Sequence, residues 1–174
     1  MKYVALLRGI NVGGNNKVEM SKLKKVFKDL GYENVLTYIN SGNVIFDADK
    51  TDVSVIERAL KKNFKFDIKV VVRDLKNIQK LCKAIPKEWV NDPEQKTDVL
   101  FLWEEYDNKK SLDLININKD VDNLLYVSGA IVWNVQRKDY KKSGMNKLIG
   151  TPVYKHMTSR NVNTTRKLLE LVGK

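Results

Sequence analysis

A loop rich in glycine and asparagine, residues 8–17, holds the residue types of this chain that are best suited to binding a ligand. It follows an apolar stretch and opens with an arginine, whose guanidinium pairs well with carboxylate or phosphate oxygens. Backbone N–H groups of such a loop can form a nest around an anion. The same residues equally suit tight turns, since glycine adopts positive φ and asparagine hydrogen-bonds nearby backbone. Both interpretations stay open, and the candidate ligand-binding residues here are Arg8, Gly9, Asn11, Gly13 and Gly14.

The loop matches neither of the two common phosphate-binding patterns. A P-loop needs glycine, any four residues, then Gly-Lys-Ser/Thr, so that the lysine neutralises a phosphate held by backbone amides. Gly9 and Gly14 have that spacing, but Asn15 and Asn16 occupy the lysine and hydroxyl positions. The dinucleotide pattern Gly-x-Gly-x-x-Gly is absent. Arg8 ends an apolar strand, so it needs a partner, which is either a carboxylate of the protein or an anionic ligand.

Two further segments carry candidate ligand-binding residues. The first is the turn at residues 40–43, whose polar side chains either shape the turn or join the Arg8 loop in one site. The second is the start of a predicted C-terminal helix, where free N–H groups and the helix dipole attract anions. An asparagine at this position caps the helix whether or not a ligand binds there. Two arginines at the positive end of the helix dipole are less expected from capping alone. The candidates are Ser41 and Asn43 in the first segment and Arg160, Asn161 and Arg166 in the second.

The sequence shows no recognised set of residues for metal binding or covalent catalysis. The single histidine, His156, has no partner at metal-ligand spacing, which favours a structural role. The single cysteine, Cys82, excludes an internal disulfide and falls on the apolar face of a predicted helix, as a buried thiol would. Trp133 is interpreted as a core residue, with stacking on a nucleic-acid base as the alternative. We therefore expect no cofactor and no metal, and the question of an enzymatic reaction stays open.

The charge of the chain is strongly positive and unevenly distributed. The 174 residues include 32 Lys/Arg and 21 Asp/Glu, a net charge of +11, and residues 136–174 hold ten basic against two acidic residues. Such a segment attracts nucleic acid or phosphorylated ligands, although surface lysines also serve solubility alone. No apolar run approaches the roughly 20 residues that span a bilayer. We expect a cytoplasmic protein without a signal peptide that does not bind a membrane.

Hydrophobic periodicity predicts the elements that position these segments. Strands are predicted at residues 3–7, 35–39, 43–47 and 68–72, and helices at residues 20–30 and 53–64. Gly31 ends the first helix, and Thr51 or Asp52 caps the second. The resulting order, β-α-β-β-α-β, is that of a ferredoxin-like unit.

The second half of the chain gives a weaker version of the same pattern. A helix is predicted at residues 75–85, strands at 99–103, 124–128 and 130–135, and helical segments within 141–156 and 164–172. The hairpin around Gly129 resembles the one around Gly42, which indicates a duplicated unit. We predict an α+β fold of two ferredoxin-like α/β-plait units packed together, residues 1–88 and 89–174, with a linker near residues 86–96 and a basic helical tail.

Several short motifs extend over nearly the whole chain: Ala5-Leu-Leu-Arg-Gly-Ile-Asn-Val-Gly-Gly, Met20-x-x-Leu23, Leu30-Gly31, Thr37-Tyr-Ile-x-Ser-Gly-Asn43-Val-Ile-Phe46 and Thr158-Ser-Arg-Asn161. Together they resemble the bacterial domain-of-unknown-function family 1697. The resemblance implies two α/β-plait units and no established activity. The tail of that family usually reads Arg-Asn-Trp, and Val162 stands in place of the tryptophan here.

These observations favour a protein that binds a phosphorylated or carboxylated small molecule. The predicted site combines the Arg8 loop with the start of the C-terminal helix at Arg160. A nucleic-acid-binding module that uses the basic C-terminal segment is the first alternative, and a structural or interaction protein without a ligand is the second. The oligomeric state, and whether the two segments meet in space, stay open.

Overall fold

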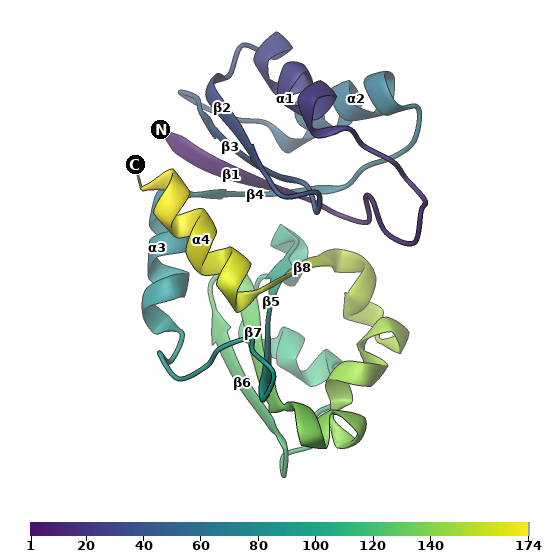
Figure 1. Ribbon diagram of the computed structural model, residues 1–174, viewed down its shortest axis with the longest axis vertical. Coiled ribbons are helices and arrows are strands. Elements are labelled where there is room, and N and C mark those ends of the chain that lie inside the picture. Colours follow the sequence, from purple (N-terminus) through teal and green to yellow (C-terminus); the bar gives the residue numbers. More distant parts are fainter. Residues whose placement is uncertain (174) are drawn as a thin grey trace. The chain divides into compact units, whose positions relative to one another are not determined.

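Two four-stranded antiparallel sheets form the framework of this protein, shown in Figure 1 as a computed structural model that describes residues 1–173. Each sheet belongs to its own compact unit. The first unit comprises residues 1–76 and the end of the chain from Leu168, and the second comprises residues 77–167. The predicted α+β fold class with two ferredoxin-like units is confirmed.

The first unit has the β-α-β-β-α-β order that its sequence predicts. Its elements are β1 (Lys2–Leu7), α1 (Met20–Asp29), β2 (Glu33–Tyr38), β3 (Asn43–Asp47), α2 (Val53–Phe64) and β4 (Val70–Asp74). The strands lie in the order β2-β3-β1-β4, with β1 antiparallel to both of its neighbours. This is the strand order of the ferredoxin-like fold, in which both helices cross over one face of the sheet.

The core of the first unit lies between this sheet and its two helices. Alternate strand residues such as Ala5, Val44 and Phe46 point to the helices, as the period of two in a strand requires. Phe27 of α1 and Leu60 of α2 are fully buried against them. Burying a side chain of this size contributes about 2 to 3 kcal/mol, so the amphipathic pattern of the helices largely determines their docking.

The N-terminus of α2 and the C-terminus of α1 are set by the residues that the sequence predicts. Asp52 caps α2 by accepting a hydrogen bond from the Ser54 N–H at 2.8 Å. At the end of α1, Gly31 has a φ of +84°, and the Tyr32 N–H reaches back to the Phe27 carbonyl at 3.3 Å. That return bond is the mark of a Schellman motif, in which glycine supplies the left-handed residue.

The second unit repeats the strand order of the first with different connections. Its elements are β5 (Gln95–Leu102), the 3₁₀ turns η1 (Glu104–Tyr106) and η2 (Lys109–Leu114), β6 (Asp122–Val127), β7 (Ala130–Gln136), the 3₁₀ turns η3 (Arg137–Lys142), η4 (Gly144–Gly150) and η5 (Pro152–His156), and β8 (Met157–Asn161). The sheet order β6-β7-β5-β8 corresponds position by position to β2-β3-β1-β4. This correspondence supports the predicted duplication, with 3₁₀ turns where the first unit has α1 and α2.

Asp122 fixes the start of η4 in the second unit. Its carboxylate accepts hydrogen bonds from the N–H groups of Asn118 and Gly144, both at 2.9 Å, and from the Ser143 hydroxyl. Burial alone would raise the pKa of Asp122, but these hydrogen bonds outweigh burial and leave the pKa below its ordinary value. The start of η4 is therefore anchored to β6.

The division of the chain differs from the predicted boundary at residue 88. The second unit begins within α3 (Leu75–Ala84), because this helix is tied to other parts of that unit. The Asn77 side chain donates to the Ser128 carbonyl at 2.8 Å, and the Cys82 thiol contacts the Thr165 carbonyl at 3.8 Å. The helix α4 (Val162–Val172) is divided between the units at Leu168.

The segment 86–96 is part of the second unit and is not a linker. The Asp92 side chain accepts hydrogen bonds from the N–H groups of Glu94 and Gln95 at 2.8 and 2.7 Å. The Arg137 Nε donates to the Asp92 carbonyl at 2.6 Å. Polar composition and proline suggest a linker, but here the polar groups fold the segment against its neighbours.

Candidate functional site

The Arg8 loop folds into a miniature hairpin at the end of β1. Val12 and Asn15 form an isolated antiparallel bridge, and the Asn15 N–H donates to the Val12 carbonyl at 3.0 Å. Gly13 and Gly14 between them have φ values of +58° and +79°. Positive φ at both central positions is typical of a type I′ turn, so both glycines are needed for the turn itself.

Asn11 closes the base of this hairpin with its side chain. Its amide nitrogen donates to the carbonyls of Val18 and Asn40, both at 2.9 Å, and its oxygen accepts from the Val18 N–H at 2.8 Å. Both amide protons and the oxygen are thereby used within the protein. Asn11 therefore stabilises the loop, and its hydrogen bond to Asn40 joins the loop to the β2–β3 turn.

The β2–β3 turn and the Arg8 loop are neighbours, which is the arrangement that a single site formed by both segments requires. The Leu7 N–H donates to the Gly42 carbonyl at 2.8 Å, because β1 pairs with β3 along this edge. Asn43 is fully buried and donates to the Tyr38 carbonyl at 2.8 Å and the Ser41 hydroxyl at 3.0 Å. Ser41 and Asn43 thus shape the turn, and ligand contact by either stays a prediction.

A hollow of about 620 Å³ lies beside the loop. Its lining residues are Asn11, Gly14, Lys17, Val18, Glu19, Met20, Ser21 and Asn40. Lys17 and Glu19 are exposed and bring one charge of each sign to the hollow. Asn11 and Gly14 are the residues of the predicted set that reach it. Arg8, Gly9 and Gly13 belong to the same loop but do not line the hollow.

The hollow lies at the N-terminus of α1. Glu19 is the N-cap residue, but its side chain accepts no capping hydrogen bond from a backbone N–H of the helix, and there is no acidic residue in the first turn. Its carboxylate accepts a hydrogen bond from the Ser21 hydroxyl instead. The first backbone N–H groups of α1 are therefore not satisfied by a side-chain cap, which leaves their partial positive charge at the hollow.

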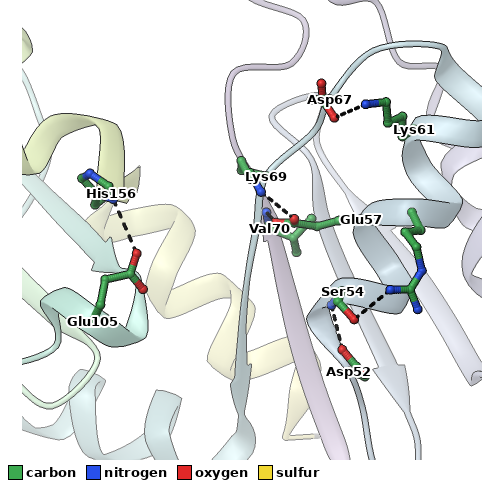
Figure 2. A network of polar contacts seen from close by, with 10 residues as sticks. Asp52, Ser54, Glu57, Lys61, Asp67, Lys69, Val70, Glu105 and His156 are labelled. Carbon is green, nitrogen blue, oxygen red and sulfur yellow. Dashed lines mark hydrogen bonds and ion pairs between the residues drawn. The ribbon is translucent and has the colours of Figure 1, made fainter.

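Arg8 is positioned by the start of β4. Its backbone N–H donates to the Lys69 carbonyl at 2.9 Å. Lys69 in turn pairs with Glu57 of α2 at 2.9 Å, and Glu57 also accepts from the Val70 N–H at 3.0 Å (Figure 2). This network holds the base of the loop between strand and helix. The Arg8 side chain is half-buried, and its role as a ligand contact stays a prediction.

The predicted C-terminal site belongs to the second unit, and its side chains make contacts within the protein. Arg160 is buried on β8 and donates to the Thr158 hydroxyl at 3.1 Å and the Ser159 carbonyl at 2.7 Å. Burial lowers the pKa of Arg160 to about 10. Asn161 caps α4 through the Thr164 N–H at 2.8 Å, and Arg166 donates to the Pro86 carbonyl at 3.0 Å. The helix cap is confirmed, and a ligand role for these residues stays a prediction.

The remaining candidates have structural surroundings. Trp133 is fully buried, so the alternative of base stacking does not apply to it. His156 is half-exposed, stacks on Tyr106 with ring centroids 4.2 Å apart, and lies 3.5 Å from a Glu105 oxygen (Figure 2). Burial raises the pKa of the Cys82 thiol to about 11, which makes it a poor nucleophile.

Across residues 1–173, no group of three or more His, Cys, Asp or Glu side chains is arranged to hold a metal ion. The same residues contain no helix that is long and apolar enough to cross a membrane.

Sequence reasoning missed two of the polar residues that line the hollow, Glu19 and Ser21. Lys17 directly follows Asn15 and Asn16, the two positions that a P-loop would fill with lysine and a hydroxyl residue. The signal for Lys17 was its place between the glycine turn and the start of α1. Asn40 was recognised as a polar residue of the 40–43 turn, and the pairing of β1 with β3 brings that turn to the hollow.

Comparison with known proteins agrees with this architecture. A solved structure, conserved bacterial protein SP0830 from Streptococcus pneumoniae, aligns with a TM-score of 0.82 and 27% sequence identity over 98% of each chain. The small subunit of acetolactate synthase from Thermotoga maritima aligns at 18% identity over 92% of this chain and 96% of its own, but its TM-score of 0.22 is too low to indicate a shared fold. No curated protein matches the chain. Residues 1–133 match the model of the family described as protein of unknown function (DUF1697), and the chain belongs to this family.

Proposed function

We propose that the protein binds a small anionic group, a carboxylate or a phosphate, in the hollow of the first unit. The observation that carries this proposal is the hollow of about 620 Å³ with Lys17 in its lining and the uncapped start of α1 beside it. A lysine ammonium and free helix N–H groups attract the same kind of ligand, because both present positive charge. Gly14 has no neighbouring heavy atom within 4 Å of where a Cβ would be, so a ligand can approach the backbone there.

The proposal assigns the charged contact to Lys17 and not to Arg8 or Arg160. Lys17 is exposed and lines the hollow, whereas Arg8 lies outside the lining and Arg160 is buried in the other unit. The loop residues serve the site indirectly. Asn11 and the glycine turn hold Lys17 at the hollow, because they close the hairpin that precedes it.

The test is ligand-observed NMR with acetate and inorganic phosphate on the wild type and two charge-matched variants. Lys17→Gln removes the ammonium at the hollow. Lys50→Gln removes an exposed lysine of the same unit that does not line it. The proposal predicts binding at millimolar concentration that Lys17→Gln weakens at least fivefold and Lys50→Gln leaves unchanged. Equal binding by both variants contradicts it.

The charge of the second unit supports a second candidate function, binding of nucleic acid. Residues 77–136 hold seven lysines against ten acidic residues, whereas residues 137–156 hold six Lys/Arg against Asp139 alone. These six basic residues are all exposed on the turns η3 to η5. An exposed basic surface of this kind suits contact with a phosphate backbone, because lysine ammonium groups attract phosphates whatever the base sequence.

A salt series of fluorescence anisotropy with labelled single-stranded RNA and duplex DNA tests this second candidate. Lys141→Gln with Lys147→Gln should weaken binding and reduce the dependence on salt. Lys109→Gln with Lys110→Gln changes the net charge equally but lies in the acidic part of the unit. If both double variants weaken nucleic-acid binding equally, or if no binding occurs near physiological salt, the basic residues of η3 to η5 do not form a specific nucleic-acid-binding surface.

A further inference from the structure

We infer that the ligand of the first-unit hollow is a zwitterion that carries an ammonium group beside its carboxylate, the class to which free amino acids belong. This inference rests on the proposed function and narrows its ligand. It follows from the side chains of both signs that line the hollow.

Glu19 adds a negative charge to the lining of the hollow that an anionic group alone does not pair with. Its exposed carboxylate lines the same hollow as Lys17, two residues away in the sequence. A phosphate or a plain carboxylate bound there experiences like-charge repulsion from Glu19 in addition to attraction from Lys17. A ligand with an adjacent ammonium group turns this repulsion into a second attraction.

The position of the Glu19 carboxylate is defined by a neighbour. The Ser21 hydroxyl, also in the lining, donates a hydrogen bond to it. The carboxylate is thereby held next to the start of α1 without capping the helix. The helix N–H groups and Lys17 are left for the carboxylate of the ligand, and Glu19 is left for its ammonium group.

The rest of the lining suits a molecule of this size and polarity. Asn40 offers an amide that can donate and accept hydrogen bonds. Val18 and the half-buried Met20 give one apolar side. The volume of about 620 Å³ is within the range of small-molecule sites, and an open hollow accepts an amino acid with its side chain directed outward or along Met20.

The experiment compares amino acids with the same molecules lacking the amino group. L-Alanine, L-leucine and L-methionine are titrated by ligand-observed NMR beside propionate, 4-methylpentanoate and 4-(methylthio)butyrate. We expect at least one amino acid to bind tenfold or more tightly than its des-amino partner. Glu19→Gln should abolish this difference while leaving the binding of the des-amino acid unchanged or stronger. Glu33→Gln, which removes an exposed carboxylate outside the hollow, serves as the charge control.

The outcomes separate this inference from the proposed function. Equal binding of each amino acid and its des-amino partner, with both weakened by Lys17→Gln, overturns the zwitterion and keeps the anion site. A preference for amino acids that persists in Glu19→Gln also overturns the role of Glu19. No binding of amino acids, acetate or phosphate overturns both.

Discussion

Cys82 shows at the scale of one residue how its surroundings decide reactivity. Burial raises the pKa of its thiol to about 11 from an ordinary value of 9.0. Two pKa units reduce the thiolate fraction at neutral pH about 100-fold, and the thiolate is the reactive form. We therefore expect Ellman's reagent at pH 7.5 to react with the native protein at least about 100-fold more slowly than with the urea-unfolded chain. Equal rates would contradict the burial of Cys82, and Cys82→Ser supplies the blank because it is the single cysteine.

For single residues of the Arg8 loop, the sequence could not distinguish a structural role from a ligand-binding role. Asparagine and glycine in the Arg8 loop fit an anion nest and a set of turns equally well, because both use the same backbone conformations. The structure shows Asn11 with its amide fully used and Gly13 and Gly14 in a two-residue turn. These contacts involve residues distant in sequence, such as Asn40, and no local pattern encodes them.

At the scale of the element, the β2–β3 turn depends on one glycine. Gly42 has a φ of +79°, and a Cβ there would lie 2.6 Å from Ile10 Cδ1 and 2.9 Å from Leu7 Cβ. Gly13 has a similar φ of +58° but open space around it. Both alanine variants incur a backbone cost of about 1 kcal/mol, and Gly42→Ala adds a packing cost of roughly 1 to 3 kcal/mol.

Urea unfolding of the Gly42→Ala and Gly13→Ala variants, monitored by circular dichroism, tests this difference in stability. Gly42→Ala should lower the free energy of unfolding by about 1 to 3 kcal/mol more than Gly13→Ala. Equal effects would mean that the end of β1 and the turn do not pack as closely as the structure shows.

In the second unit, the start of η4 is held by Asp122, which lies on the edge strand β6. Its pKa is lowered in the folded protein, so the stabilisation from its ionised form is present at neutral pH and is lost as the pH falls below about 4. Asp122→Asn should reduce stability at pH 7 by about 1 to 3 kcal/mol and flatten the loss of stability between pH 5 and pH 2.

Tryptophan fluorescence during urea unfolding at several pH values measures this effect. Trp89, Trp103 and Trp133 all belong to the second unit and therefore report on its unfolding. Asp120→Asn removes a nearby exposed carboxylate and should leave the pH profile unchanged. An Asp122→Asn profile that falls as steeply as the wild-type profile would contradict this account.

The elements of the first unit were predictable from sequence and those of the second only in part. Helical and strand periodicity identified all six elements of the first unit, because each buries one regular apolar face. The strand β8 was missed, since its buried residues include Thr158 and Arg160 and its polar composition is typical of a helix start. The 3₁₀ turns have no sustained period, so the prediction of helical segments within residues 141–156 covered only the region of η3 to η5, and η1 and η2 were not predicted.

At the scale of the whole molecule, two units with one strand order carry different surfaces. The first unit keeps both crossover helices and has the mixed-charge hollow at the start of α1. The second replaces its crossover helices with turns and gathers exposed basic residues on η3 to η5. The fold class and the duplication were predictable from patterns repeated along the chain. The hollow was not, because Asn40 joins the lining residues from 11–21 only through the pairing of β1 with β3.

The measurement that most directly tests the central claim is a titration of ¹⁵N-labelled protein with inorganic phosphate, followed through backbone amide chemical shifts. The account predicts that the amides of Gly14, Lys17, Ser21 and Asn40 shift together with one saturation curve. Shifts confined to residues 137–156 or to the surroundings of Arg160, or no shifts at all, would contradict an anion site in the first-unit hollow.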